Sequence, residues 1–322
     1  MPRFDMPLEE LVNYRPPLTA EPDLDAFWAN TLQQAAQQPL NATLEKQDYP
    51  ALGCTVFKLT YDGWQGSRIA AWYLRPEGDG PFPGLVQYHG YSGSKAEVFG
   101  YLPWALQGYA LLAVDVRGQS GDSADTFPYP GGHVKGWMTQ GILDPEVYYY
   151  RGVYVDCIRA LDWLCSNGDV DPQRVGVMGM SQGGGLTLAV ASLDARPVLA
   201  MPEMPYLAHF RRAVDMAMRQ PYLEIPDYLR RWPEREATVW RTLSYFDVMN
   251  LASRVRCPVL MTVGLQDDIC PPSTVYAAYN QIQSPKEIRV YPYHNHEMVQ
   301  AHWETKLRWA HHHLKGLDTL KG

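Results

Sequence analysis

From Pro83 onward, the chain alternates short apolar segments with segments of helical, amphipathic pattern. The apolar segments lie at residues 84–90, 109–118, 174–181, 197–204, 257–267 and 286–293. The helical segments lie at about 96–107 and 148–166, from 182, from Ser273, and at about 297–314. Apolar strands without regular polar alternation are typical of a parallel sheet covered by helices on both faces. The alternation therefore predicts an α/β fold with a mostly parallel central sheet.

The N-terminal part of the chain precedes this alternation. Residues 22–37 have the apolar periodicity of a helix. Residues 54–63 and 67–76 are two extended segments joined by a turn-rich stretch, which is the pattern of an antiparallel hairpin. We therefore expect an N-terminal helical extension at about 1–45, followed by a hairpin that leads into the sheet.

One stretch interrupts the alternation between two expected strands. Residues 206–250 are helical in pattern, rich in arginine and aromatic side chains, and contain no strand pattern. A sheet flanked by helices commonly reaches a length of 322 residues as one unit. We predict a single domain over residues 1–322, with a helical insertion at about 206–250 that roofs the site.

The motif Gly179-Met180-Ser181-Gln182-Gly183 falls where an expected strand turns into an expected helix. This is the G-x-S-x-G pattern of a nucleophile elbow, in which a sharp turn presents the serine hydroxyl above the sheet. Glycines on both sides leave room for the turn, and the helix N-terminus supplies free N–H groups for a developing oxyanion. Alone, the motif also fits a plain glycine-rich turn.

A serine nucleophile needs an imidazole base, and the base needs an acid that orients the imidazole ring. In α/β-hydrolases, an Asp or Glu and then a His follow the serine along the chain. Asp267 and Asp268 end one expected strand, and His294 and His296 follow the next. Both pairs lie at the C-terminal edge of the sheet, where open α/β sheets place their sites. Spacing favours His296 over His294 and leaves the two aspartates unresolved.

The segment 86–94 follows an expected strand at the same edge, where this fold recruits a second oxyanion donor. The expected donors are the backbone N–H groups of Tyr91 and Gln182. We expect His89 to fix the geometry of this loop and not to act as a base. Arg117, in a glycine-rich turn without a dinucleotide fingerprint, is expected to pair with an acidic group and tie loops together.

Composition narrows the class of protein. Hydrophobic residues make up 46% of the chain and charged residues 20%, and the formal net charge is -7. An acidic excess gives no electrostatic basis for binding nucleic acid or an anionic membrane. The opening residues lack an apolar export signal, and no stretch has the length and apolarity of a membrane span, so we expect a cytoplasmic protein. The five cysteines form no CxxC pair, which predicts reduced, mostly buried thiols.

Several motifs together resemble one family. The set "RGQ" at 117–119, "GMSQGG" at 179–184 and "HE" at 296–297 is similar to the signature of carbohydrate esterase family seven, the acetyl xylan esterases and cephalosporin C deacetylases. Longer stretches that begin "MTQGILDPEVYYY" and "DDICPPST" agree, and the likeness covers about residues 5–315.

The resemblance implies a nucleophile at Ser181, an orienting acid at Asp267 and a base at His296. It also matches Tyr91 and Gln182 to the oxyanion hole. It implies hydrolysis of acetyl esters on short xylooligosaccharides and on cephalosporin C, by a homohexamer whose sites face an internal cavity. Neither a cofactor nor a metal is expected.

Three other functions are compatible with parts of the sequence pattern. A prolyl-oligopeptidase-like peptidase shares the triad order but usually carries a large accessory domain, for which the chain has no room. A general short-chain carboxylesterase would use the same residues on other acyl groups. A binding protein on an inactive hydrolase fold would typically lack the serine or the histidine, and both are present here.

Overall fold

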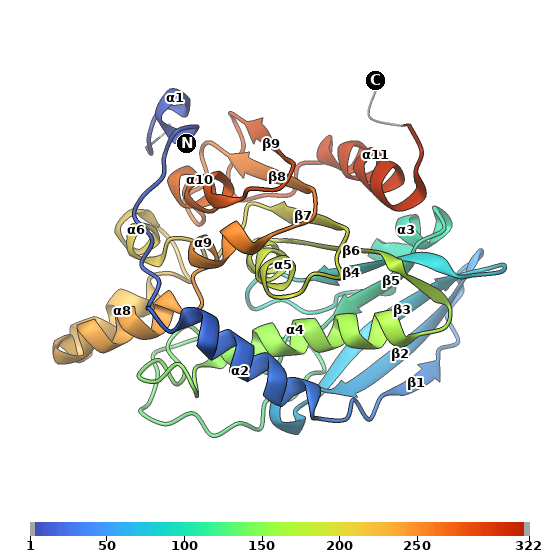
Figure 1. The fold of residues 1–322 in the computed structure, drawn as a ribbon, viewed down its shortest axis with the longest axis horizontal. Coiled ribbons are helices and arrows are strands. Elements are labelled where there is room, and N and C mark those ends of the chain that lie inside the picture. The colour runs from blue at the N-terminus through green and yellow to red at the C-terminus, as the bar shows by residue number, and fades with distance from the viewer. Residues whose placement is uncertain (1–3, 319–322) are drawn as a thin grey trace.

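The computed structural model describes residues 4–318, which form a nine-stranded sheet in the order β1-β2-β3-β5-β4-β6-β7-β8-β9 (Figure 1). The strands are β1 (Thr43–Lys46), β2 (Cys54–Asp62), β3 (Arg68–Pro76), β4 (Phe82–Tyr88), β5 (Ala110–Val114), β6 (Val170–Met180), β7 (Leu199–Glu203), β8 (Val259–Gly264) and β9 (Lys286–Tyr291). Neighbours from β5 to β9 pair in parallel, whereas β1, β2 and β3 are antiparallel to their neighbours. The predicted parallel sheet and N-terminal hairpin are both confirmed.

Helices cover both faces of this sheet. The α-helices of the described residues are α1 (Leu8–Leu11), α2 (Leu24–Ala36), α3 (Leu102–Leu106), α4 (Tyr149–Ser166), α5 (Gln182–Leu193), α6 (Phe210–Met216), α7 (Glu224–Arg231), α8 (Glu236–Ser244), α9 (Val248–Leu251), α10 (Pro272–Gln281) and α11 (His302–Lys315). None of the helices in the described part of the chain has the length and apolar character needed to cross a membrane.

The strands supply apolar side chains to two separate cores because successive residues point to opposite faces. Val86 and Leu112 belong to the large cluster that contains α4 and α5, whereas Leu85 and Leu111 belong to the cluster that contains α3 and α11. Both faces of the central strands are therefore buried, which explains why their sequences are continuously apolar.

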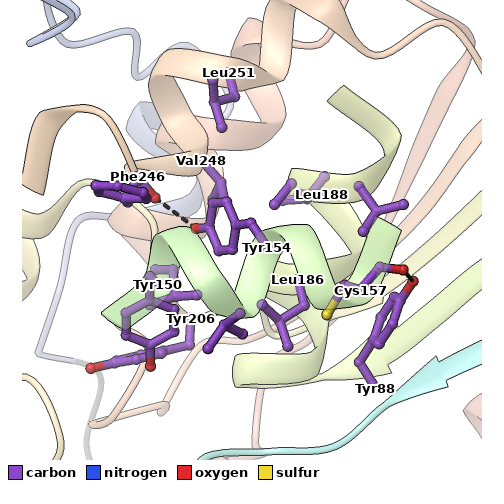
Figure 2. Close-up of a cluster of buried hydrophobic side chains, with 14 of the residues drawn as sticks. Tyr88, Tyr150, Tyr154, Cys157, Leu186, Leu188, Tyr206, Phe246, Val248 and Leu251 are labelled. Atoms are coloured by element: carbon purple, nitrogen blue, oxygen red, sulfur yellow. Dashed lines mark hydrogen bonds between the residues drawn. The ribbon is translucent and has the colours of Figure 1, made fainter. Parts of the chain in front are cut away.

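Tyrosines dominate the core between α4, α5 and the strands (Figure 2). The Tyr154 hydroxyl donates to the Phe246 carbonyl oxygen at 2.7 Å, and the Tyr88 hydroxyl donates to the Cys157 carbonyl oxygen at 3.0 Å. Buried phenols need such partners, and these bonds join α4 to β4 and to the segment before α9. They fix α4 next to α5, the helix that begins immediately after Ser181.

Both stretches expected to be helical contain helices, but the N-terminal stretch at about 1–45 also contains the start of β1, a strand that the sequence pattern did not predict. Between β7 and β8, residues 206–250 contain α6, α7, α8 and most of α9, and no strand among the described residues. The N-terminal helix expected at 22–37 is α2.

Two helices are shorter than predicted. The helix expected at 96–107 is a 3-10 turn at Val98–Tyr101 followed by the five-residue α3, because Pro103 lacks the N–H that a helix interior requires and fits only in the first turn of α3. The helix expected at 297–314 begins only at His302. The preceding residues form turns instead, in which Glu297 N–H donates to Asn295 O and His302 N–H donates to Val299 O.

The cysteine prediction also agrees with the structure. All five thiols are unpaired; Cys54, Cys157, Cys257 and Cys270 are buried and Cys165 is half-buried.

Candidate active site

Ser181 lies in the turn between β6 and α5, with φ of 60° and ψ of -121°. A non-glycine residue rarely adopts this conformation, which is the strained geometry of a nucleophile elbow. The end of β7 holds the turn in place: Ser181 N–H donates to Glu203 O, and Tyr206 N–H donates to Ser181 O, both at 2.9 Å. The strain is therefore supported by backbone bonds from a neighbouring strand.

The flanking glycines are required by close backbone contacts. A Cβ atom at Gly183 would lie 2.0 Å from the Tyr88 carbonyl oxygen, and one at Gly179 would lie 2.6 Å from the Gly183 carbonyl. No side chain fits at either distance. This explains the glycines on both sides of Ser181.

Asp267 and His296 meet at the carboxyl edge of the sheet. Asp267 follows β8 and His296 follows β9, and the distance from His296 Nδ1 to Asp267 Oδ2 is 2.7 Å. The other oxygen of Asp267 accepts the N–H groups of Ile269 and Cys270 at 2.9 and 2.8 Å. The carboxylate is thus fixed through both oxygens and holds the His296 imidazole by Nδ1.

The neighbouring aspartate and histidine have other surroundings. The Asp268 carboxylate pairs with Arg219, whose Nε lies 3.0 Å from Oδ1. The His294 ring packs against Tyr291 with centroids 5.4 Å apart, and its buried Nδ1 has no partner among the described residues. The His296 ring thus contacts the carboxylate of Asp267, whereas the carboxylate of Asp268 contacts Arg219.

The expected oxyanion donors lie beside the nucleophile. A Cβ built on Gly90 would be 3.7 Å from Ser181 Cβ, so the loop that carries Tyr91 runs next to the serine. In residues 4–318, no hydrogen bond is recorded for the backbone N–H of Tyr91 or of Gln182. Within these described residues, both N–H groups are therefore without a protein acceptor.

A buried polar network fixes Gln182. Its side-chain oxygen accepts hydrogen bonds from the Tyr150 hydroxyl and from Gln119 Nε2, each at 2.9 Å. The Gln119 oxygen in turn accepts the Ser92 N–H at 2.9 Å. The network links the start of α5 to the oxyanion loop, so the two expected donors are held relative to each other.

The Tyr91 side chain is held by residues that sequence reasoning did not find. Its hydroxyl donates to Glu224 Oε1 at 2.8 Å and accepts the Trp137 N–H at 2.6 Å. Glu224, on α7, also accepts the Met138 N–H at 3.0 Å, and burial raises the pKa of its carboxyl group. Nothing in the sequence singles out Glu224 among the charged residues of the insertion.

His89 and Arg117 hold the surrounding loops, as expected. The His89 ring bridges Gly90 O at 2.7 Å and Val116 N–H at 2.9 Å, and burial lowers its pKa, so the neutral ring donates from Nδ1 and accepts at Nε2. The Arg117 guanidinium binds both oxygens of Asp156 on α4, at 2.6 and 2.7 Å.

A cavity of about 610 Å³ opens onto Ser181 and His296. Its remaining lining residues are Gln87, Tyr88, His89, Gly90, Tyr91, Ser92, Ser94, Ala96, Tyr101, Met180, Gln220, Pro221, Ile269 and Met298. From the insertion only Gln220 and Pro221 line it, so the expected roof of aromatic and arginine side chains is wrong. Tyr206, Phe210 and Tyr222 are buried against one another instead, which removes them from the cavity.

Sequence and structure comparisons bear on what this site does. The family model described as acetyl xylan esterase (AXE1) matches residues 1–313. The chain belongs to the acetyl xylan esterase family. This makes it a carboxylic ester hydrolase with the α/β-hydrolase fold, and it confirms the resemblance noted from the motifs.

Individual relatives of this esterase agree with the assignment. It is 31% identical to the acetyl esterase Axe7A of Xylanibacter ruminicola over 314 residues, which is 93% of this chain and 69% of that protein. The structure of an acetyl xylan esterase from Paenibacillus sp. R4 superimposes with a TM-score of 0.94 at 49% identity, over 96% of this chain and 100% of that one. Acetyl xylan esterase 1 from Thermoanaerobacterium sp. JW/SL YS485 gives 0.91 at 36% identity, over 95% and 98%.

One further side chain of the esterase lies close to the nucleophile. Burial, with a smaller contribution from Asp267, raises the pKa of the Cys270 thiol, and the nearby Ser181 side chain acts in the opposite direction. The same thiol, the Asp267 carboxylate and the His296 ring place one donor atom each within 4.8 Å of one another. The sequence reasoning treated Cys270 only as a buried thiol, although it stands three residues after Asp267.

Proposed function

We propose that this esterase removes acetyl groups from small acetylated carbohydrates, such as xylooligosaccharides, and from cephalosporin C. The proposal places Ser181 as nucleophile, His296 as general base and acid, and Asp267 as the orienting acid. The observation that carries it is the 2.7 Å contact between Asp267 and His296 beside a serine held in a strained elbow. Family membership supplies the acetyl ester as the substrate class.

In the first half-reaction, the Ser181 oxygen attacks the acetyl carbonyl carbon while His296 Nε2 takes the hydroxyl proton. The carbonyl oxygen becomes an oxyanion that accepts the backbone N–H groups of Tyr91 and Gln182. Asp267 stabilises the imidazolium through its contact with Nδ1. His296 then gives the proton to the departing sugar oxygen, which leaves the acetyl group bound to Ser181.

In the second half-reaction, water takes the place of the sugar. His296 removes a proton from the water, which attacks the acyl-enzyme, and acetate leaves as the Ser181 oxygen regains its proton. The cavity of about 610 Å³ has room for a sugar as well as for the acetyl group. Its lining is mixed, with Ser92, Ser94 and Gln220 available as hydrogen-bonding partners for sugar hydroxyls.

A substrate panel tests the proposal. Acetylated xylooligosaccharides, cephalosporin C, monosaccharide peracetates and p-nitrophenyl esters of increasing chain length are compared, with Ser181→Ala as the inactive control. We expect kcat/KM to fall steeply from acetate to butyrate and to be negligible at octanoate. A maximum at butyrate or longer esters would instead favour a general carboxylesterase, and cleavage of peptides in preference to esters would favour a peptidase.

We also propose a homohexameric assembly, which the family resemblance implies, and a cytoplasmic location. Sites that face an enclosed cavity would make polymeric xylan a poor substrate compared with short oligosaccharides. Light scattering coupled to size-exclusion chromatography measures the assembly directly.

A further inference from the structure

We propose that Asp267, Cys270 and His296 form a binding site for a zinc-like divalent transition metal ion, and that occupancy of this site switches the esterase off. The proposal concerns an ion that competes with catalysis and takes no part in it. Its inhibitory consequence rests on the proposed roles of Ser181, Asp267 and His296, whereas metal binding itself does not.

The chemistry of the three donors fits zinc. The site offers one thiol sulfur, one imidazole nitrogen and one carboxylate oxygen, and all three donor atoms lie within 4.8 Å of one another. Sulfur, nitrogen and oxygen donors of these types are the ordinary ligands of Zn²⁺, whereas Mg²⁺ and Ca²⁺ prefer oxygen ligands alone. The donor set therefore selects a borderline-soft transition metal.

The geometry is close to that of a tetrahedral site. With bonds of about 2.0–2.3 Å, the donors around a tetrahedral zinc ion are separated by roughly 3.5 Å. One edge of the triangle, from His296 Nδ1 to Asp267 Oδ2, already measures 2.7 Å. This edge has to lengthen by about 0.8 Å, and an edge at the 4.8 Å limit has to contract by about 1.3 Å.

Two of the donors come from a single preformed turn. Asp267 Oδ1 accepts the N–H groups of Ile269 and Cys270, so the turn that carries both donors is closed before any ion arrives. Both residues are buried, and His296 and Ser181 line the cavity through which an ion would enter. The Ser181 side chain lies close to the Cys270 thiol.

Among the described residues, the thiol of Cys270 is not already held as a thiolate by another partner in the site. Burial disfavours its ionised form, and a divalent cation supplies the charge that a buried thiolate needs. On binding, the ion takes a lone pair from sulfur and the thiol proton leaves to solvent.

The ion inhibits the esterase in either case, whether Nδ1 or Nε2 of His296 binds it. If Nε2 is the ligand, its lone pair is no longer available to the Ser181 proton. If Nδ1 is the ligand, its proton moves to Nε2, which then donates and cannot accept. In both cases His296 ceases to act as a base, so acylation stops while the fold is retained.

Cobalt(II) spectroscopy tests the binding without reference to activity. The full-length protein, freed of metal with EDTA, is titrated with Co²⁺, and we expect one equivalent to produce a thiolate-to-cobalt charge-transfer band that Zn²⁺ abolishes. Cys270→Ser and Cys270→Ala should both lack the band. Cys165→Ser, which removes the half-buried thiol, should retain it and serves as the matched control. Histidines such as those of α11 give no thiolate band, so they cannot mimic the signal.

Zinc inhibition tests the consequence, with each variant compared with its own metal-free rate. Loss of an outer-shell partner already costs about 10–100-fold in metal affinity, so the half-inhibitory Zn²⁺ concentration should rise at least about tenfold in Cys270→Ser. Mg²⁺ at the same concentration should leave the rate unchanged, and EDTA should restore it. The absence of a cobalt band, or equal zinc inhibition of the parent and Cys270→Ser, would overturn the proposal. If no esterase activity is found at all, the proposed function fails, and the cobalt titration still decides whether the metal site exists.

Discussion

The Tyr91 hydroxyl donates a 2.8 Å hydrogen bond to Glu224, which joins the oxyanion loop to a helix of the insertion. Glu224 is buried, and its second oxygen accepts the Met138 N–H. The insertion therefore contacts the site in two ways. Glu224 holds the Tyr91 side chain, and Gln220 and Pro221 line the cavity. The backbone N–H that we expect to bind the oxyanion belongs to the residue whose side chain this contact holds.

Replacement of Glu224 tests that connection. In Glu224→Ala the Tyr91 hydroxyl and the Met138 N–H lose their acceptors, and each unpaired buried group costs about 1–3 kcal/mol. We expect a lower free energy of unfolding and a fall in kcat that exceeds the change in KM, measured by denaturant titration and steady-state kinetics. Asp227→Asn, on the same helix but paired with Lys135 at the surface, is the control and should change both little. If Glu224→Ala keeps the parent's kcat, the contact does not position the oxyanion loop.

The two histidines after β9 give a second prediction. His296→Ala and Ser181→Ala should each abolish esterase activity, because they remove the base and the covalent step. His294→Ala should keep substantial activity, since the His294 ring packs against Tyr291 and its buried Nδ1 has no hydrogen-bond partner among residues 4–318. Circular dichroism and thermal unfolding check that each variant is folded. An inactive His294→Ala beside an active His296→Ala would reverse the assignment.

The two aspartates after β8, Asp267 and Asp268, give a third prediction. Asp267→Asn should lower kcat by up to about ten-thousand-fold, because the amide donates to Nδ1 and stabilises the wrong imidazole tautomer. Asp268→Asn weakens only the pairing with Arg219, so we expect a far smaller loss. Steady-state kinetics on p-nitrophenyl acetate measures both. Losses of equal size would leave neither aspartate assigned as the acid.

Local patterns predicted the parts of the molecule that depend on neighbouring residues. The parallel sheet follows from apolar strands buried on both faces, and the elbow follows from glycines that leave no room for a Cβ beside Tyr88 O. Spacing alone left Asp267 and Asp268 equal, because two adjacent residues at a strand end both reach the carboxyl edge. The family resemblance favoured Asp267, and the contact with His296 agrees with that choice.

Long-range contacts could not be predicted in this way. Glu224 is 133 positions from Tyr91, and the sequence shows no periodicity that relates them. The aromatic residues of the insertion were expected over the cavity, yet burying Tyr206 and Tyr222 in the core removes more apolar surface from water. The start of the last helix was misplaced because residues before His302 form turns that extend the loop carrying His296.

The last prediction concerns acid stability and His302 at the start of α11. The residue is fully buried, and its Nδ1 lies 3.0 Å from the Tyr291 hydroxyl. Burial, together with the nearby Lys306 and Arg289, lowers its pKa from 6.5 to about 3. The unfolded chain therefore binds this proton more tightly than the folded protein does between these two values. Stability from the neutral ring is fully present above pH 6.5 and is lost as the pH falls towards 3.

We expect the free energy of unfolding of the parent to decrease as the pH falls through this window, with His302 contributing at most about 5 kcal/mol at about 1.4 kcal/mol per pKa unit. His302→Phe keeps a ring but cannot take up a proton, so its stability should decline less steeply over the same range. Tyr291→Phe removes the same hydrogen bond but retains the imidazole, and it should keep the parent's steeper dependence. Denaturant titrations at closely spaced pH values measure the three slopes. Identical slopes for the parent and His302→Phe would mean that protonation of His302 does not drive the acid transition.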